Sequence, residues 1–304
     1  MAHKDIYRYF REDYAGHSKA NAYLLALLSH YVYKEKLPGS GAFESRFKNL
    51  FQDLSDTDPF VVQTFTESLP FPYDTEVAIL ANSRVVLVVF RGTEGVTAIK
   101  DWITNSKHLM MDAPDDWGDV KLHKGFYNAL SQVYQSVRSE VRSRRTNNQK
   151  VFLTGHSLGG ALATICAYRF QKVGGVPVAG VYVFGAPRVG DIGFANAYNN
   201  LLKDKTFRWV KNLDFASTLP DYAPPPLPTT RYHHVGSLNF IKANGAIEVD
   251  HLDVEPIGIP SIADHDMRNY CITMYSRLSK DKRQSDSNPA YLVQSDVPAS
   301  GLFG

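Results

Sequence analysis

Two hydrophobic patterns alternate along the chain. Short apolar runs predict strands, whereas apolar positions that recur every three or four residues predict helices. We expect strands at residues 76–82, 85–90, 151–154, 178–184, 207–211 and 232–241, the first two joined as a hairpin. We expect helices at residues 22–28, 126–141, 157–173 and 266–278. Such alternation is typical of an α/β fold, with a mostly parallel sheet and helices on both of its faces.

The length of the chain suits one large domain. With 304 residues, 44% of them hydrophobic, the chain can bury a large core, and we expect a single domain over residues 1–304. After Pro220 a proline-rich stretch predicts a stiff loop that cannot join the interior of a sheet. Residues 280–304 are rich in Ser, Asp and Pro and predict a loosely attached tail.

Composition narrows the possible partners and compartments. The 33 basic and 31 acidic side chains nearly balance, which gives no electrostatic reason to expect a nucleic-acid partner. Cys166 and Cys271 each lie in an apolar helical pattern, typical of buried thiols rather than a disulfide framework. No apolar run predicts a transmembrane segment, and residues 22–28 suit a buried helix better than a signal peptide. We therefore expect secretion only if a leader has been removed, and otherwise a cytoplasmic protein.

The sequence around Ser157 is typical of a catalytic serine. A short apolar strand runs into Gly155-His156-Ser157-Leu158-Gly159, the pattern Gly-x-Ser-x-Gly, and a helical pattern follows. In this context the serine occupies a sharp strained turn that lifts its hydroxyl clear of the sheet. Because a helix starts here, its first amides can stabilise negative charge. The alternative is a glycine-rich helix start that the serine merely caps.

A neutral serine is a weak nucleophile and needs a base, together with a carboxylate that orients the base. In Gly-x-Ser-x-Gly hydrolases the acid and then the histidine follow the serine along the chain. His265 is the preferred base because it ends an apolar loop directly before the last predicted helix. The alternatives are His233 and His234, at the start of a predicted strand, and His251, in an acidic loop. That loop also permits a metal-site interpretation, which its spacing does not support.

Asp214 is the preferred acid because it follows the predicted strand 207–211, and open α/β sheets place their sites at the carboxyl ends of strands. Asp191, close to its own turn, and Asp221, an ordinary surface charge, are the alternatives. The reaction also needs two backbone amides that face the oxygen of a tetrahedral intermediate. We expect these from Leu158, next to the nucleophile, and from Thr93, in the turn that ends strand 85–90.

Five sequence blocks occur in a characteristic order between about residues 22 and 275. They are Phe90-Arg91-Gly92-Thr93, Asp101-Trp102, His123-Lys124-Gly125-Phe126, Gly155-His156-Ser157-Leu158-Gly159-Gly160 and Phe184-Gly185-Ala186-Pro187-Arg188-Val189-Gly190. In these blocks the chain resembles the class 3 lipases, the family of filamentous-fungal triacylglycerol lipases. The resemblance implies an α/β-hydrolase fold with a Ser157, Asp214 and His265 triad, and with Thr93 and Leu158 as the oxyanion hole. The family usually shows Asp-x-Val-Pro-x-Leu-Pro at the acid, whereas this chain keeps the aspartate and the final Leu-Pro but lacks the first proline.

In such lipases a helical lid follows the oxyanion turn, which implies a lid at about residues 94–108 in this chain. On a helix, four apolar side chains of this segment share one face: Val96, Ile99, Trp102 and Ile103. A lid would bury that face over the site in water and present it to lipid at an interface. An ordinary surface helix that stays packed on the body is the alternative.

These observations predict a serine carboxylic ester hydrolase that cleaves acyl glycerols through an acyl-enzyme, most simply a triacylglycerol lipase. A feruloyl esterase and a phospholipase A1 are the alternatives on the same scaffold. A lipase-like binding module without catalysis is disfavoured because the chain keeps a candidate residue for every catalytic role. We expect a lipid or other ester as the substrate, at a lipid–water interface, and no metal, cofactor or nucleic acid.

Overall fold

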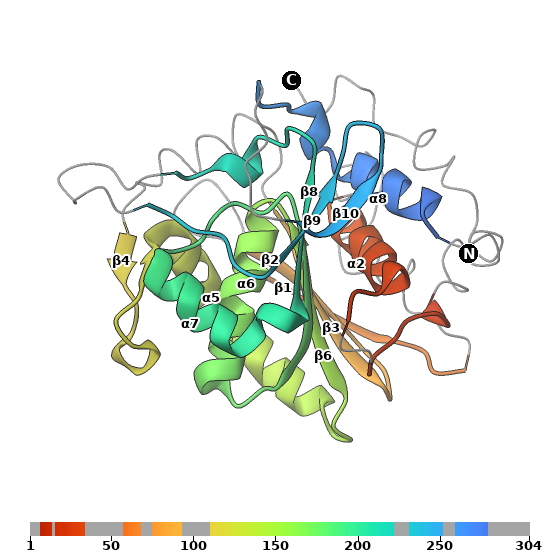
Figure 1. The fold of residues 1–304 in the computed structure, drawn as a ribbon. Helices are drawn as coiled ribbons and strands as arrows, with labels where there is room; N and C mark the ends of the chain where they lie inside the picture. Colours follow the sequence, from red (N-terminus) through yellow and green to blue (C-terminus); the bar gives the residue numbers. More distant parts are fainter. Residues whose placement is uncertain are drawn as a thin grey trace.

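A computed structural model describes residues 7–13, 16–33, 57–67, 75–92, 110–221, 231–251 and 259–278. Within these residues, the centre of the protein is an eight-stranded sheet (Figure 1). Across the sheet the strands are β1 (Val61–Glu67), β2 (Thr75–Ala81), β3 (Val85–Phe90), β6 (Lys150–His156), β7 (Val178–Phe184), β8 (Thr206–Lys211), β9 (Ser237–Ile241) and β10 (Ile247–His251). Strands β3, β6, β7, β8 and β9 run parallel, whereas β1 and β2 at one edge and β10 at the other pair antiparallel.

Helices cover both faces of this sheet (Figure 1). On one face lie α2 (Lys19–Tyr31) and α8 (Met267–Ser276), and on the other lie α5 (Lys124–Arg144), α6 (Leu158–Arg169) and α7 (Ile192–Leu202). Alternate residues of β3 point to the two sides: Val86 and Val88 join the core under α5 and α6, and Val85 and Leu87 join the core under α2 and α8. Because both faces are covered, the central strands are continuous apolar runs.

Short elements connect these layers. They are the two-stranded ladder of β4 (Met110–Asp112) and β5 (Lys121–His123), the π-turn η3 (Phe170–Gly174), and the 3₁₀ turns η2 (Asp115–Trp117), η4 (Lys203–Lys205), η5 (Ala216–Thr218) and η6 (Ala263–His265). Two of these turns matter for the site, because η5 follows Asp214 and η6 ends at His265.

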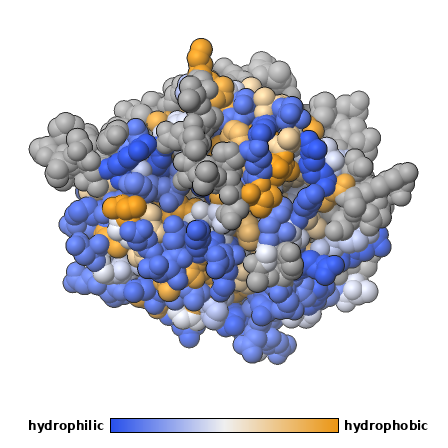
Figure 2. Space-filling view, in the orientation of Figure 1, coloured by the Kyte–Doolittle hydropathy of each residue, from blue (hydrophilic) through white to orange (hydrophobic). Residues whose placement is uncertain are grey.

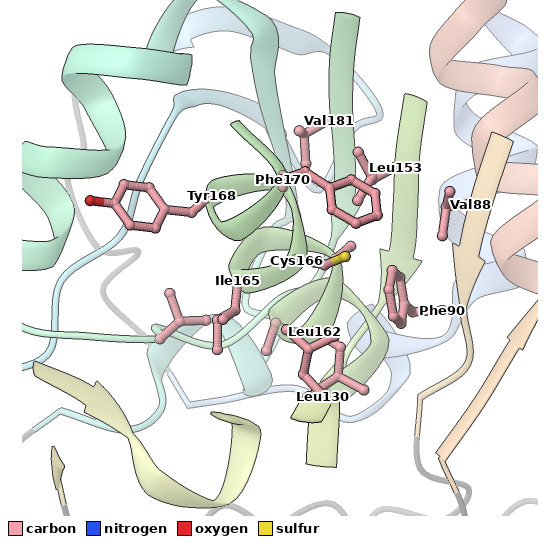
Figure 3. Close-up of a cluster of buried hydrophobic side chains, with 14 of the residues drawn as sticks. Val88, Phe90, Leu130, Leu153, Leu162, Ile165, Cys166, Tyr168, Phe170 and Val181 are labelled. Atoms are coloured by element: carbon pink, nitrogen blue, oxygen red, sulfur yellow. The ribbon is translucent and has the colours of Figure 1, made fainter. Parts of the chain in front are cut away.

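The core on the side of α5, α6 and α7 packs helix α6 tightly against the sheet. Figure 3 shows Leu162 and Cys166 of α6 among side chains of the strands, and both are essentially inaccessible to solvent. Burying one side chain the size of leucine contributes about 1.5–3 kcal/mol. Cys166 and Cys271 are free, buried thiols, in agreement with their apolar patterns. The tight packing fixes the start of α6, where Ser157 lies.

The surface of the described part is mixed in character. Figure 2 shows hydrophilic side chains over most of the visible face, with scattered hydrophobic residues between them. Single exposed apolar residues such as Val61, Ile192 and Val249 are ordinary on a folded protein.

The mostly parallel sheet with helices on both faces confirms the predicted fold class, and strands 85–90 and 178–184 have the predicted bounds. The predicted strand 232–241 was too long: β9 begins at Ser237, because the amide of His233 pairs instead with the carbonyl of Gly190. The acidic segment that carries His251 is not a loop, since β10 extends to this residue. The helix expected to reach residue 173 ends at Arg169 and continues as the π-turn.

Some expectations fall on residues that the structure does not describe. The lid at about residues 94–108 and the tail at residues 280–304 lie outside the described ranges. Thr93 and the four apolar lid residues, Val96, Ile99, Trp102 and Ile103, are likewise outside them. Among the helices that the structure does describe, none combines the length and the apolar character needed to cross a bilayer.

Candidate active site

The turn between β6 and α6 is strained at Ser157. Its backbone has φ 55° and ψ −128°, a left-handed conformation that residues other than glycine seldom adopt. A Cβ atom at Gly159 would lie 2.3 Å from the carbonyl oxygen of Phe90, and one at Gly155 would lie 2.4 Å from the backbone of Gly159. The two glycines of the motif therefore allow backbones to pack where no side chain fits, as the sequence pattern predicted.

The nucleophile candidate lies at the start of a helix and away from solvent. Ser157 is fully buried, and its Oγ has no hydrogen-bond partner among the described residues. Its amide donates to the carbonyl of Phe184, which fixes the turn on β7. Leu158 is the first residue of α6, so its amide has no acceptor within the helix. A hydroxyl and a helix-start amide thus occupy neighbouring positions.

Asp214 and His265 form a buried acid–base pair. The His265 Nδ1 atom lies 2.8 Å from Asp214 Oδ1, and the two residues are 0% (Asp214) and 4% (His265) exposed. Since a carboxylate only accepts, Nδ1 carries the proton that is shared in this bond. The other ring nitrogen, Nε2, is buried and has no hydrogen-bond partner within the described ranges. In the neutral ring, Nε2 therefore presents a free lone pair.

The position of this base relative to the serine follows from ring packing. The ring of His265 lies against the ring of His156, with 4.3 Å between centroids and 35° between planes. His156 is the residue directly before Ser157. The ring of Phe215, one residue after the acid, also contacts the ring of His265, at a centroid distance of 4.8 Å and with 63° between planes. The imidazole is thus held between the serine turn and the acid turn.

Asp214 remains an anion despite its burial. Burial raises the pKa of this carboxyl, but the positive field of His265 and hydrogen bonds from His265 and Tyr270 outweigh it, so that the pKa lies below its ordinary value. Tyr270 donates to Oδ2 over 2.6 Å, and the amide of Ala216 donates to Oδ1 over 2.9 Å. Burial, followed by the charge of Asp214, raises the pKa of Tyr270, so this hydroxyl stays a neutral donor.

A second carboxylate, Asp264, holds the base segment on the end of strand β8. Its side chain accepts from Lys211 Nζ at 2.8 Å, from Asn212 Nδ2 at 2.9 Å and from the amide of Leu213 at 3.3 Å. Burial raises the pKa of Asp264, but the hydrogen bonds from Lys211 and Asn212 outweigh it and leave the pKa below its ordinary value. The contacts tie the residue before His265 to the three residues before Asp214.

Gly185, at the end of β7, lets the pair approach the sheet. Its φ is 51°, and a Cβ atom there would lie 2.4 Å from Asp214 Oδ2 and 3.0 Å from His265 Nδ1. Any side chain at this position would displace the pair. Within the block Phe184-Gly185-Ala186, the lack of a side chain at Gly185 thus leaves the space that the Asp214–His265 pair occupies.

The missing proline of the acid segment is replaced by a hydrogen bond. Ser217 occupies that position, and its Oγ donates to the carbonyl of Asp214 at 2.8 Å. Its own carbonyl lies 2.7 Å from His234 Nε2. Ser217 thereby closes the turn that follows the acid, as a proline would do through its fixed φ angle.

The alternative acids have other partners. Asp191 caps α7, where it accepts from the amides of Phe194 and Lys121 at 2.8 and 3.1 Å. Asp221 forms an ion pair with Arg231 at 3.1 Å. Both carboxylates are engaged away from His265, which contacts Asp214 instead.

The alternative bases also lie in other surroundings. His234 contacts the carbonyl of Ser217, and burial lowers its pKa well below the ordinary value. His233 pairs through its backbone with Gly190, and His251 ends the edge strand β10. Among the described residues, no cluster of three or more potential metal ligands occurs.

Sequence reasoning missed Tyr270 and Asp264. Tyr270 lies on helix α8, 56 residues after the acid that it contacts, and nothing in the local pattern distinguishes it from other buried tyrosines. Asp264 directly precedes the preferred base, and this adjacency could have marked it as a candidate. The roles predicted for Thr93 and for the lid stay predictions, because these residues lie outside the described ranges.

The sheet, its helical layers and the serine turn between β6 and α6 define the α/β-hydrolase fold. Residues 87–223 match the family model "Lipase (class 3)". Over this region the chain is similar to the class 3 lipase family, in agreement with the resemblance of its sequence blocks.

Individual relatives agree with this assignment. A lipase of Rhizomucor miehei is 33% identical over 131 residues, which cover 41% of this chain and 35% of the relative. A secreted mono- and diacylglycerol lipase 1 of Fusarium solani is 36% identical over 117 residues, 38% of this chain and 34% of the relative. The matches thus span about a third of each relative's length. A lipase from Rhizopus microsporus var. chinensis shares the fold at a TM-score of 0.62 and 23% identity, over 82% of this chain and 87% of that one.

Proposed function

We propose that this protein hydrolyses acyl glycerols by a serine acyl-enzyme mechanism, with Ser157 as nucleophile, His265 as base and Asp214 as the acid that orients it. The observation that carries the proposal is the buried Asp214–His265 hydrogen bond, which leaves His265 Nε2 as an acceptor. This ring packs on the residue next to Ser157, whose Oγ is buried and lacks a partner among the described residues. Neither atom is engaged by another described group, so both are available for the hydrogen bond that must form between them when substrate binds, since proton transfer needs hydrogen-bond contact.

In the proposed first half-reaction, Ser157 Oγ attacks the ester carbonyl carbon while its proton passes to His265 Nε2. The carbonyl oxygen becomes an oxyanion, for which the amides of Leu158 and Thr93 are the proposed donors. The tetrahedral intermediate collapses, the bond to the alcohol oxygen breaks, and the alcohol takes the proton from His265. Asp214 stays ionised and stabilises the imidazolium while it exists.

In the second half-reaction, water replaces the alcohol. It gives a proton to His265 Nε2 and attacks the acyl carbon, and the new intermediate releases the fatty acid and returns the proton to Ser157 Oγ. The two half-reactions use the same two proton positions, on Ser157 Oγ and on His265 Nε2.

The proposed substrate class rests on the family and on the names of the relatives. One is a lipase and the other a mono- and diacylglycerol lipase. The helical spacing of Val96, Ile99, Trp102 and Ile103 in the sequence supports a lid that opens at a lipid–water interface, since an apolar face of this kind would be buried in water and exposed to lipid. We therefore propose acyl glycerols in an aggregated phase as the substrate.

The mechanism is tested with Ser157→Ala. Its hydrolysis of p-nitrophenyl butyrate should fall by about 10⁴-fold to 10⁶-fold, because the nucleophile is removed while the fold is kept. A variant that keeps most of the activity contradicts the mechanism. A matched control is Ser143→Ala, which removes an exposed hydroxyl near the end of α5 and should leave the activity unchanged.

The substrate class is tested with tributyrin, phosphatidylcholine and methyl ferulate. A lipase should show a sharp rise in rate when tributyrin passes from solution into droplets, and little activity on the other two esters. A rate that follows simple saturation across this transition would indicate an esterase without interfacial activation. A preference for phosphatidylcholine would indicate a phospholipase A1, and a preference for methyl ferulate a feruloyl esterase.

A further inference from the structure

His156 lies between the nucleophile turn and the base. Its Nε2 atom is 2.8 Å from the backbone carbonyl oxygen of His265, and its Nδ1 atom is 3.1 Å from the hydroxyl oxygen of Tyr33. The side chain comes from the last residue of β6, whereas Tyr33 follows the end of α2 and His265 ends η6. One imidazole therefore joins its own strand to two segments that lie 123 and 109 residues away along the chain.

These contacts determine which ring nitrogen carries the proton. A carbonyl oxygen only accepts, so Nε2 must be the protonated nitrogen and must donate to His265. In the neutral ring Nδ1 is then an acceptor, so the single proton of the Tyr33 hydroxyl is shared between Nδ1 and the His156 carbonyl oxygen, to which the hydroxyl also donates. The same hydroxyl lies 3.2 Å from the carbonyl oxygen of His156, so Tyr33 contacts both the ring and the backbone of this residue.

We propose that His156 is a positioning residue for the base, and that Tyr33 keeps His156 in the tautomer that holds His265 in place. The proposal rests on the proposed function, because it assigns His156 a role only if His265 accepts the proton of Ser157. His156 holds the backbone of the base, while Asp214 holds its ring through Nδ1. Together they fix where Nε2 of His265 points.

The role needs a ring that stays neutral. His265 becomes a cation in each half-reaction, and its ring centroid is 4.3 Å from that of His156. A second cation so close would oppose the protonation of the base. Burial, and secondarily the charge of His265, lower the pKa of His156 to about 3, so His156 is neutral at neutral pH.

Tyr33 also lies against the strand that leads to the proposed oxyanion donor. A Cβ atom at Gly92 would lie 2.0 Å from the Tyr33 hydroxyl and 2.6 Å from the His156 carbonyl oxygen. Gly92 directly precedes Thr93. The hydroxyl thus lies close both to the nucleophile turn and to Gly92, two residues after the end of β3, so its loss should disturb more than one catalytic element.

A purely structural histidine would affect folding alone, and the variants are chosen to separate the two roles. His156→Phe removes both hydrogen bonds and keeps a ring of similar shape. His156→Gln keeps an N–H donor toward the His265 carbonyl and cannot become a cation. Tyr33→Phe removes only the hydroxyl. Tyr198→Phe is the matched control, because its buried hydroxyl contacts Thr206 at 2.8 Å, away from the site.

Each folded variant is assayed with p-nitrophenyl butyrate, a short soluble ester. His156→Phe should lower kcat by about 10-fold to 100-fold with KM within about twofold, since a small displacement of a catalytic group has effects of that size. Gln at this position should recover most of the loss, and Tyr33→Phe should lower kcat by a smaller factor. Tyr198→Phe should lose thermal stability with kcat unchanged. If His156→Phe keeps the kcat of Tyr198→Phe, or if Gln is no better than Phe, the proposal is wrong.

Two further measurements keep the outcome unambiguous. The wild-type protein is first treated with a fluorophosphonate. If the wild type is not labelled, the proposed function itself is wrong. If the wild type is labelled but the His156 variants keep their kcat, only this inference is wrong. If His156→Phe does not fold, ¹⁵N-histidine NMR of the wild type decides, with the His156→Gln spectrum to assign the signal. A neutral ring protonated at Nε2 between about pH 5 and about pH 9 is expected, well above the lowered pKa. The opposite tautomer, or a cation in that range, overturns the proposal.

Discussion

Gly185→Ala tests whether the close approach of strand β7 to the acid–base pair matters for activity. The new Cβ atom would lie 2.4 Å from Asp214 Oδ2 and 3.0 Å from His265 Nδ1, distances at which atoms must move. The Asp214 carboxylate is fixed by Ala216 and Tyr270, so it cannot move without losing a hydrogen bond. We expect the pair to shift and Nε2 of His265 to turn away from its present direction.

The magnitude has two parts. A residue with a Cβ atom at φ 51° destabilises the fold by about 1–2 kcal/mol relative to glycine. Forcing an extra methyl group into a packed site adds about 1–3 kcal/mol. The free energy of unfolding should therefore fall by about 2–5 kcal/mol. Because the orientation of the base is lost, kcat should fall by about 10²-fold to 10⁴-fold.

Gly175→Ala is the matched control, since Gly175 has φ 65° but a Cβ atom there would meet nothing within 4 Å. It should show the backbone part of the destabilisation alone, with full activity. Urea unfolding measures the stability of both variants, and p-nitrophenyl butyrate hydrolysis measures their kcat. If Gly185→Ala matches Gly175→Ala in both assays, the geometry of the Asp214–His265 pair does not govern activity and the reasoning is refuted.

Two further predictions concern the carboxylates. Asp214→Asn should lower kcat by about 10⁴-fold, because an amide no longer stabilises the imidazolium of His265; a loss below about tenfold in the ester assay would contradict its role. Asp264→Asn should lower the free energy of unfolding by about 1–2 kcal/mol at about pH 7, since hydrogen bonds from Lys211 and Asn212 to a charged group are lost. The folded pKa of Asp264 lies below its ordinary value, so the stability from this group is fully present above about pH 4 and is lost as the pH falls through the folded pKa. The difference in unfolding free energy from wild type, measured by urea titration, should thus shrink toward about pH 3, and a difference that grows on acidification would contradict the ion-pair account.

The sequence predicted the central strands well, because a strand that is buried on both faces is a continuous run of apolar residues. Strands 85–90 and 178–184 are uninterrupted apolar runs with the predicted bounds. The edge strands β1 and β10 were not predicted from the sequence. An edge strand has only one neighbouring strand, and both of these strands mix polar and apolar residues, so neither is a continuous apolar run. Residues 232–236 have the pattern of a strand, but the backbone of His233 pairs with Gly190 rather than with β8.

The candidate site likewise contains residues that the sequence predicted and contacts that it did not. Ser157 could be identified from its local motif, because the glycines and the turn are consecutive in sequence. The contact between Asp214 and His265 joins residues 51 positions apart, and its existence was inferred only from the order of candidates and from the family resemblance. Tyr33, which lies 123 residues before His156, has no sequence signal for its contact. The contact of Tyr33 with His156 depends on where helix α2 ends in the packed fold, and local sequence patterns do not predict such a contact.

The central claim is that Ser157 is activated by the His265–Asp214 pair. The most direct measurement is fluorophosphonate labelling followed by mass spectrometry of the peptides. The account predicts one phosphonate adduct, on Ser157, and its loss in Ser157→Ala and in His265→Ala, with Gly175→Ala labelled as fast as wild type. An adduct on another residue, or labelling of His265→Ala at the wild-type rate, would contradict it.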